Sequence, residues 1–321
     1  MADLIDVKSY FLKKNEISKL QKFLKINWNK KHLFCKDKKI LKWQHFFEDK
    51  LLFLCEKKNG KLKSLVGVIN QSRDKFFKII SIGILCSNYR MGAVNIFKKL
   101  DLIGFSIIKA IGLTKEIIPL YKIHNYTVGS LKIYYIKNLK IKNSKIFKNL
   151  SSHRKNKKNF ELLPNHINKI LDKKLAKKYK KYLEWRFISH PYYEYKFIDS
   201  PDKKLILIYR EIKIKGYKFL RIVDFLGTFK NQKNFISSLS NFCEVNNYHF
   251  IEFMHHGYQD RFIKKTIFKL VKKNQKIPIN VEPFDNFKKE NLYFAYKCKK
   301  NIRIKIVRAD ADADRPNKKI K

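Results

Sequence analysis

The stretch FKIISIGILCSNYRMGAVNIFKKLDLIG, residues 77–104, decides the fold. Its first ten residues are mostly apolar and predict a buried β-strand over 77–86. A polar turn from Ser87 to Gly92 follows, and residues 93–104 have the spacing of a helix. A strand that passes through a glycine-containing turn into a helix presents free backbone N–H groups at the positive end of the helix dipole. Such a turn favours an anion such as a pyrophosphate.

The segments around this unit predict a mixed sheet with helices packed on it. Asn59-Gly60 separates two apolar runs and predicts a hairpin, because both residues tolerate the backbone of a tight turn. Thr114 is expected to cap a helix that ends near Asn125, a residue that suits a left-handed C-cap. The other expected helices cover 7–26 and 93–104, and the expected strands cover 51–56, 62–70, 77–86, 107–113 and 128–137.

The second half of the chain repeats this order of elements. Expected helices cover 164–187, 231–247 and 260–273, and expected strands cover 204–212, 218–227, 249–255, 292–297 and 302–307. The polar, Lys-rich stretch between the halves has little periodicity and predicts a linker. The sequence therefore predicts an α/β protein of two tandem domains that arose by duplication, divided into residues 1–140, a basic linker over 141–160, and residues 161–321.

The net charge of the chain is extreme, with 73 basic residues against 27 acidic ones and a formal charge of +46. Only ten of the basic residues are Arg, and the 63 Lys are spread over most segments. The abundance of Lys, Asn, Ile, Phe and Tyr indicates AT-rich codons. A nucleic-acid reader would use more Arg, because its guanidinium binds phosphate and guanine bidentately. Nucleic acid is therefore not expected as a partner, while a peripheral contact with an anionic membrane stays open.

The sequence leads us to expect neither a secretory signal nor a disulfide or zinc framework. The first 18 residues contain no apolar core of a secretory signal, and no run approaches 18 consecutive apolar residues. The five Cys are widely separated and form no CxxC pair. Hydrophobic residues make up 45% of the chain, enough to build real cores. We expect a folded protein of the cytoplasm.

The turn Asn88–Asn95, NYRMGAVN, resembles the Q/R-x-x-G-x-G/A turn of the GNAT acyltransferases. It departs from that pattern in two ways, because Arg90 lies two residues before Gly92 and no second Gly follows. The resemblance implies that acetyl-coenzyme A or another acyl-coenzyme A binds around residues 86–95. The residues implied at the coenzyme are Arg90, Gly92 and Ala93 at the pyrophosphate, and Leu85 and Cys86, by their backbone, along the pantetheine arm.

The segment after the next strand is similar to a second GNAT motif, A-x-x-L-Y-x-x-x-G-F. Leu120 and Tyr121 match it, Asn125 stands in the place of the Gly, and Tyr126 stands in the place of the final aromatic residue. In that family the tyrosine protonates the departing coenzyme A thiolate. The resemblance implies this catalytic role for Tyr121, and the alternative is a helix tyrosine that only packs.

The second half carries three strings that resemble a family of tandem GNAT-like proteins encoded in bacterial surface-polysaccharide gene clusters. They are W-R-F-x-x-H-P from Trp185, R-I-V-D-x-x-G from Arg221, and D-x-D-R-P-N from Asp312. The resemblance covers roughly residues 40–321. It implies a sugar acceptor and a role in polysaccharide biosynthesis.

Four residues in or beside these strings are candidates for the acceptor side: Arg186, His190, Tyr193 and Asp224. A structural salt bridge for the first two and a turn-capping role for Asp224 stay open. The alternation of Asp310, Asp312 and Asp314 resembles the start of a calcium loop, but the Gly and the final Glu of that loop are missing. We expect no metal here, and favour carboxylates that staple the fold by meeting the Lys excess.

The sequence thus predicts an enzyme, an acyl-coenzyme A-dependent N-acyltransferase acting on an amino sugar or a nucleotide sugar. One alternative is a non-catalytic GNAT pair that binds a sugar or an assembly partner. A second alternative is a Fem-type aminoacyltransferase, which pairs GNAT folds and uses charged tRNA. No general base stands out among the candidates Glu48, Asp49, Glu56, His45 and His124.

Overall fold

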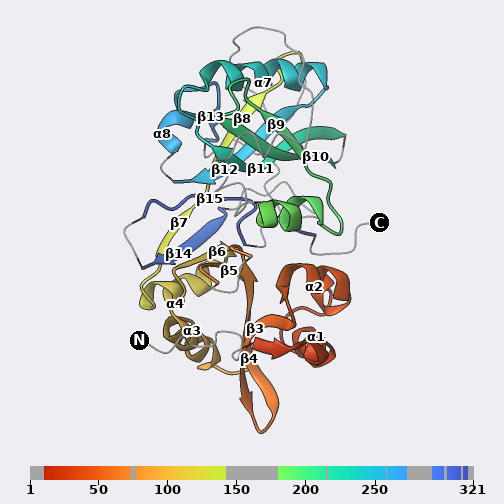
Figure 1. The fold of residues 1–321 in the computed structure, drawn as a ribbon, viewed down its shortest axis with the longest axis vertical. Coiled ribbons are helices and arrows are strands. Elements are labelled where there is room, and N and C mark those ends of the chain that lie inside the picture. Colours follow the sequence, from red (N-terminus) through yellow and green to blue (C-terminus); the bar gives the residue numbers. More distant parts are fainter. Residues whose placement is uncertain are drawn as a thin grey trace.

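The structure is a computed structural model. It describes residues 11–73, 77–141, 180–214, 216–257, 259–272, 291–299, 302–311 and 314–316. Two mixed β-sheets form its framework, and helices pack on both, so the predicted α/β class is confirmed (Figure 1). The predicted linker over 141–160 lies outside the described residues, apart from residue 141, as does most of the predicted helix over 164–187.

The first sheet runs in the spatial order β1-β3-β4-β5-β6-β14-β7, with β2 paired to β3. The predicted hairpin at Asn59-Gly60 is confirmed, because both residues have positive φ angles between β3 and β4. The strands are β1 (Phe11–Lys13), β2 (Phe46–Phe47), β3 (Lys50–Lys58), β4 (Lys61–Asn70), β5 (Ile79–Ser87), β6 (Ile107–Leu113), β7 (Thr127–Ser130) and β14 (Tyr293–Cys298).

Two layers of helices cover opposite faces of the first sheet (Figure 1). In β3, Leu51 and Phe53 face α1 and α2, whereas Leu52 and Leu54 face α3 and α4, as the period of two in a strand requires. The helices are α1 (Ile17–Asn27), α2 (Lys38–His45), α3 (Gly92–Ile103) and α4 (Ile118–Ile123), with short 3₁₀ turns η2 (Lys14–Glu16), η3 (Leu33–Cys35) and η4 (Lys115–Ile117).

The second sheet runs in the order β13-β8-β12-β11-β10-β9, with β15 paired to β12. The helix α7 (Lys233–Val245) confirms the predicted helix over 231–247. The remaining elements are β8 (Lys132–Lys137), β9 (Lys196–Asp199), β10 (Leu205–Ile214), β11 (Tyr217–Gly227), β12 (Phe250–His256), β13 (Lys269–Leu270), β15 (Ile306–Val307), α8 (Asp260–Ile263) and the π-helical turn η6 (Glu184–Ile188).

Three predicted elements differ in the structure. Residues 11–13 were expected in a helix but form β1, because Phe11 and Leu12 are buried against β3. The predicted strand over 128–137 is two strands in different sheets. The predicted helix over 260–273 ends at Ile263, and residues 269–270 pair with β8 instead. In each case the deciding contact is with a strand far away in the sequence.

The two sheets exchange one strand each. β8 lies in the first half of the chain but pairs with β12, and β14 lies in the second half but sits between β6 and β7. A boundary at residue 140 therefore does not by itself separate the two sheets. The division of the chain into two domains and a linker stays a prediction.

The strand–helix–strand unit β5-α3-β6 of the first half is repeated by β11-α7-β12 in the second. In both units the first and last strands are parallel neighbours. Both first strands carry a β-bulge, at Gly83 and at Val223, directly after their last pair with the parallel neighbour. The strand then continues for four more residues in each case, to Ser87 and to Gly227. This match is what a duplicated fold predicts.

Candidate functional site

The parallel pairing of β5 with β6 stops before the carboxyl ends of the two strands, and the region between these ends is called the first crevice below. Their parallel pairing runs from Ile79 with Ile107 to Ile82 with Ala110, and then stops. The bulge at Gly83 turns β5 away from β6, as bulges do when they bend a strand. The backbone edge of β5 from Ile84 to Ser87 is thus left without a strand on this side, ready to bond the amides of an extended ligand.

The side chains of Leu85 and Cys86 do not enter the first crevice. Leu85 packs toward α3, and Cys86 is buried on the opposite face of the sheet. Burial raises the pKa of the Cys86 thiol to about 11. These two residues, predicted at the pantetheine arm, can therefore contribute only their backbone, which is the contact the sequence predicted.

The turn between β5 and α3 is open and its helix end is uncapped. No side chain caps α3, and its first turn contains no acidic residue. Within the described residues, the N–H groups of Arg90 and Met91 donate to no acceptor. Both side chains are exposed, whereas Ala93 is partly buried. Backbone donors at a helix N-terminus beside an exposed guanidinium form a site that favours an anion.

Gly92 is required by close packing at the start of α3. A Cβ at this position would lie 2.2 Å from Ser87 Oγ and 2.8 Å from Ser64 Cβ. Only a residue without a side chain fits there, so the Gly that carried the motif match has a physical reason.

A buttress under the turn is formed by Glu56, which the sequence named only as a candidate base. Its carboxylate accepts hydrogen bonds from the Tyr89 hydroxyl, from Ser64 Oγ at 2.8 Å, and from Asn95 Nδ2 at 3.0 Å. Burial acts to raise the pKa of Glu56, but these hydrogen bonds outweigh it and lower the pKa. A carboxylate held in three bonds positions the turn, and nothing in the linear sequence signalled it.

Tyr121 lies in the core between β6 and α3. Its side chain is 2% exposed, and its ring meets Phe97 and Tyr126 edge to face at 4.9 and 5.1 Å. The predicted αL cap after it is confirmed, because Asn125 has a φ of 62°. Tyr121 therefore packs more tightly than a half-buried helix residue would. The role of its hydroxyl in proton transfer stays a proposal.

Three of the four predicted acceptor-side residues gather around Trp43. His190 stacks on Tyr193 at 4.8 Å and meets Trp43 edge-on at 4.3 Å. The Arg186 guanidinium lies over the same indole at 5.3 Å. The Trp43 and Trp185 rings are also stacked, and each indole N–H donates to the other residue's carbonyl, at 2.9 and 2.7 Å. This cluster joins α2 to η6, and the sequence did not single out Trp43.

Two buried nitrogen atoms of this cluster have no partner within the described residues. Arg186 donates through Nε to Ala309 O and through Nη2 to Asp314 O, both at 3.1 Å, but its Nη1 bonds nothing. The Nδ1 atom of His190 accepts from the N–H groups of Tyr192 and Tyr193, so Nε2 carries the proton, and it too bonds nothing. Burial, and then the charge of Arg186, lower the pKa of His190 to about 2.

The fold is similar to solved acetyltransferase structures. A GCN5-related N-acetyltransferase from Anabaena variabilis matches over 88% of this chain and 71% of its own, with a TM-score of 0.51 and 10% identity. A probable N-acyltransferase from Enterococcus faecalis matches over 90% and 71%, with a TM-score of 0.51 and 12% identity. No protein-family model matches the chain, and no curated protein matches it. The chain has the fold of the GCN5-related N-acetyltransferases, or GNATs.

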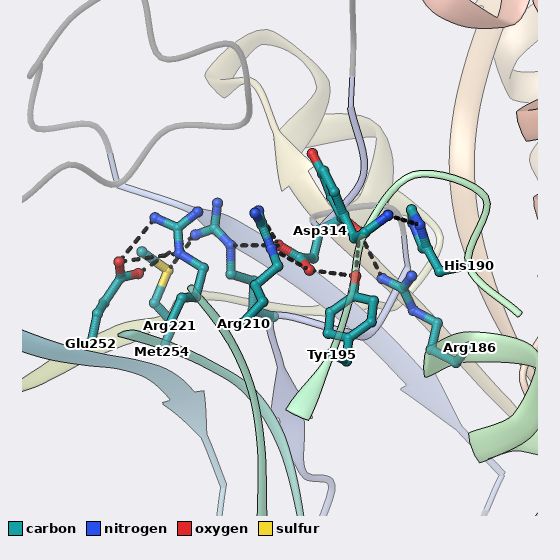
Figure 2. Close-up of polar contacts among 10 residues, drawn as sticks. Arg186, His190, Tyr195, Arg210, Arg221, Glu252, Met254 and Asp314 are labelled. Carbon is teal, nitrogen blue, oxygen red and sulfur yellow. Dashed lines mark hydrogen bonds and ion pairs between the residues drawn. The ribbon is translucent and has the colours of Figure 1, made fainter. Parts of the chain in front are cut away.

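The second GNAT-like half contains a row of buried charges (Figure 2). Arg210 donates twice to the Asp314 carboxylate, at 2.9 and 3.1 Å, and the Tyr195 hydroxyl donates to it at 2.7 Å. Arg221 donates to Glu252 at 2.9 Å. Burial acts to raise the pKa of Asp314, but Arg210 and the neighbouring cations hold it well below its usual range. The Asp314 carboxylate is thus ionised, and its ion pair with Arg210 ties β10 to residues 314–316, while Arg221 and Glu252 join β11 to β12.

Residues 302–311 and 314–316, called the C-terminal segment below, connect the two GNAT-like halves. Asp310 accepts from Lys109 on β6 at 2.9 Å and from Gln71, directly after β4, at 3.0 Å. Arg315 forms a hydrogen bond at 2.7 Å with His32, which also lies in the first half. Asp314 pairs instead with Arg210 of the second half. The stapling role predicted for this motif is seen at Asp310, where a carboxylate meets a lysine.

Asp224, the fourth predicted acceptor residue, makes its hydrogen bonds outside the Trp43 cluster, although its charge acts on Arg186. Its carboxylate accepts from Lys305 Nζ at 2.9 Å and from the Phe225 N–H at 2.7 Å. Within the described part of the chain, no group of three or more potential ligands is placed to hold a metal ion. Among the described helices, none is long and apolar enough to cross a membrane.

Proposed function

We propose that the chain is an acyl-coenzyme A-dependent N-acyltransferase that binds its acyl donor in the first crevice. The observation that carries this proposal is the separation of β5 from β6 beside an uncapped α3. The pantetheine amides would pair with the open backbone of Leu85 and Cys86. The pyrophosphate would meet the backbone around Arg90, Gly92 and Ala93, where the helix dipole and a cation favour negative charge.

The reaction would be a single acyl transfer. The acceptor amine attacks the thioester carbonyl, a C–N bond forms, the C–S bond breaks, and the amine gives up a proton. The thiolate that leaves takes a proton, and Tyr121 is the proposed donor. Its position on α4, beside β6, supports this role, although its hydroxyl must reach the sulfur within about 3 Å.

The acceptor is proposed to be an amino sugar or a nucleotide sugar of a surface polysaccharide. Arg186, His190 and Tyr193 would receive it at the junction of the two halves. The unpartnered Nη1 of Arg186 and Nε2 of His190 support this, because buried donors without partners are costly unless a ligand satisfies them. Asp224 would contribute only if its bond to Lys305 opens.

Binding and turnover can be tested separately. Isothermal titration with acetyl-coenzyme A should detect binding, and mass spectrometry should detect an acetylated product with an amino-sugar acceptor. Arg90→Glu should weaken binding by about tenfold or more, because it places a negative charge at the pyrophosphate. The control is Lys98→Glu, an exposed residue further along α3. A wild-type protein that binds no acyl-coenzyme A would overturn the proposal.

A non-catalytic GNAT pair is the second candidate, and the burial of Tyr121 favours it. In that case coenzyme A or a sugar would bind without turnover on any acceptor. The Fem-type variant with charged tRNA is supported only by the net charge of +46, which codon bias explains equally well. Aminoacyl transfer from charged tRNA would identify it.

A further inference from the structure

The second half contains an opening with the same construction as the first crevice, called the second crevice below. β11 and β12 pair in parallel from Leu220 with Ile251 to Ile222 with Phe253, and then stop. The bulge at Val223 follows directly, as Gly83 does in β5. By backbone geometry alone, the second crevice would be an equal candidate for a pantetheine arm.

The chain's own C-terminal segment occupies the second crevice. β15 pairs with β12, Val307 with His255 and Ile306 with His256. Because β8 already pairs with the other edge of β12, β15 lies on the edge that faces β11. On the β11 side, the Ala309 N–H donates to Val223 O at 2.9 Å.

Two further observations show how closely the C-terminal segment packs against β11 and the end of β12. Lys305 Nζ donates to the backbone carbonyl of Phe225 at 2.9 Å, and a Cβ built on Gly257 would lie 2.6 Å from Ile304 O. In the first half, a Cβ built on Gly112 near the end of β6 would meet nothing within 4 Å. The backbone groups that an acyl donor would use in the second crevice are therefore already bonded by the protein.

The turns that follow the two crevices also differ in how their backbone N–H groups are bonded. In the second turn, the Phe229 N–H donates to Gln259 Oε1 at 3.3 Å, and the Lys230 N–H donates to Thr228 Oγ1 at 3.1 Å. At the corresponding positions of the first turn, the Tyr89 N–H donates to Ser87 Oγ at 3.2 Å, and the Arg90 N–H donates to no acceptor within the described residues. Neither α3 nor α7 has a side-chain cap, so the turns differ by one bonded donor and the main distinction is the filled crevice.

The segment is anchored from both sides of the molecule by buried charges. Asp310 is held by Lys109 of the first sheet, and Asp314 is held by Arg210 of the second. Removing one partner of a buried ion pair costs about 3–5 kcal/mol, so an occupant held by two such pairs does not leave readily.

From these contacts we infer that the chain has a single coenzyme A site, in the first crevice, and that residues 304–310 fill the second crevice permanently. The inference rests on the proposed function for the first crevice. The second half then serves as a scaffold and contributes to the acceptor side. It cannot bind coenzyme A in place of the first half.

The stoichiometry of binding tests this inference. Native mass spectrometry with acetyl-coenzyme A should show one molecule per chain. Arg90→Glu should weaken binding by about tenfold or more, and the matched exposed residue of the second turn, in Lys230→Glu, should change it by less than about twofold. Two molecules per chain, or loss of binding in Lys230→Glu with Arg90→Glu unaffected, would overturn the inference.

Hydrogen exchange tests the filled crevice without any ligand. The amides of Val307 and Ala309 should exchange as slowly as those of the β11 core, both with and without acetyl-coenzyme A. Fast exchange in the ligand-free protein would contradict the permanent occupant even if one coenzyme A binds. Slow exchange together with no coenzyme A binding would overturn the proposed function while the filled second crevice stands.

Discussion

The first and second crevices share their backbone geometry but differ in the side chains on their central strands. Two residues before the bulge, β5 has Ser81 and β11 has Arg221; one residue after it, β5 has Ile84 and β11 has Asp224. All four side chains are buried. A buried charge needs a partner, and the second crevice obtains partners from β12 and from the C-terminal segment.

This difference teaches where to look for an occupied crevice in a duplicated fold. The buried side chains of β5 beside its bulge are neutral, whereas Arg221 and Asp224 of β11 are ionisable and pair with Glu252 and Lys305. Of these two partners, Lys305 belongs to the segment that fills the second crevice. The bonded backbone of β11, more than its charges, distinguishes the filled crevice, because Lys109 on β6 also pairs with the C-terminal segment, through Asp310.

Tyr121→Phe gives the largest expected effect on turnover. It tests whether the first half alone carries the chemistry. The second-half helix α8 (Asp260–Ile263) contains no tyrosine. If Tyr121 is the general acid, turnover should fall about 100- to 10,000-fold while coenzyme A affinity stays within about twofold. Steady-state kinetics and titration measure the two quantities. Unchanged turnover would make Tyr121 a packing residue and would favour the non-catalytic alternative.

Asp314→Ala tests how far the second crevice depends on its charges. The change leaves Arg210 buried without its carboxylate and should lower the free energy of unfolding by about 3–5 kcal/mol. Urea denaturation measures it. The first-crevice comparison is Ser81→Ala, whose buried Oγ has no hydrogen-bond partner within the described residues, so the change should be close to neutral. Equal effects of the two substitutions would break the contrast between the crevices.

Gly92→Ala tests the packing of the first turn. A Cβ 2.2 Å from Ser87 Oγ must displace its neighbours, so we expect a loss of about 1–3 kcal/mol in unfolding free energy. The matched change in the second half is Lys233→Ala at the exposed start of α7, expected within about 0.5 kcal/mol. A Gly92→Ala protein of undiminished stability would show that the turn relaxes easily.

The pH dependence of stability compares one buried histidine from each half. Burial lowers the pKa of His45 to about 3 and that of His190 to about 2. Both are neutral when folded, whereas the unfolded chain binds protons near pH 6.5. Their stabilisation is therefore present above pH 6.5 and is lost as the pH falls toward the folded-state pKa, by about 1.4 kcal/mol per pH unit for each histidine.

Urea denaturation at pH 7, 6 and 5 measures this slope. His190→Asn retains an acceptor for the Tyr192 and Tyr193 N–H groups. It should reduce the slope by the contribution of one histidine, about 1.4 kcal/mol per pH unit, whatever its effect on stability at pH 7. A slope that His190→Asn leaves unchanged would mean that folding does not lower the pKa of this imidazole.

Local patterns predicted the parts of the fold that depend on neighbours in sequence. The hairpin at Asn59-Gly60, the unit from β5 to α3, and the αL residue Asn125 are all set by turn chemistry and periodicity within a few residues. The strand exchange could not be predicted this way. Within residues 127–137 the sequence offers only the short Gly129-Ser130 break, and the division into two strands comes from pairing with distant β14 and β12.

The candidate site shows the same limit. The motif strings and the aromatic cluster beside them indicated Arg186, His190 and Tyr193, and the fold does bring these three together. They did not indicate Trp43, because an aromatic residue on an amphipathic helix carries no local sign of its partner. The short strand near 302–307 was predicted, yet its place in the second crevice was not. That place is fixed by pairing with β12 and by buried charges contributed from both halves.

The position of β14 has a consequence for synthesis on the ribosome. This strand separates β6 from β7, although about 160 residues of chain lie between β7 and β14. At 5–20 residues per second, the facing edges of β6 and β7 wait about ten to thirty seconds for their partner. Unpaired strand edges are templates for aggregation. The first half therefore cannot complete its sheet until β14 has been synthesised, and the unpaired edges of β6 and β7 need protection for that time.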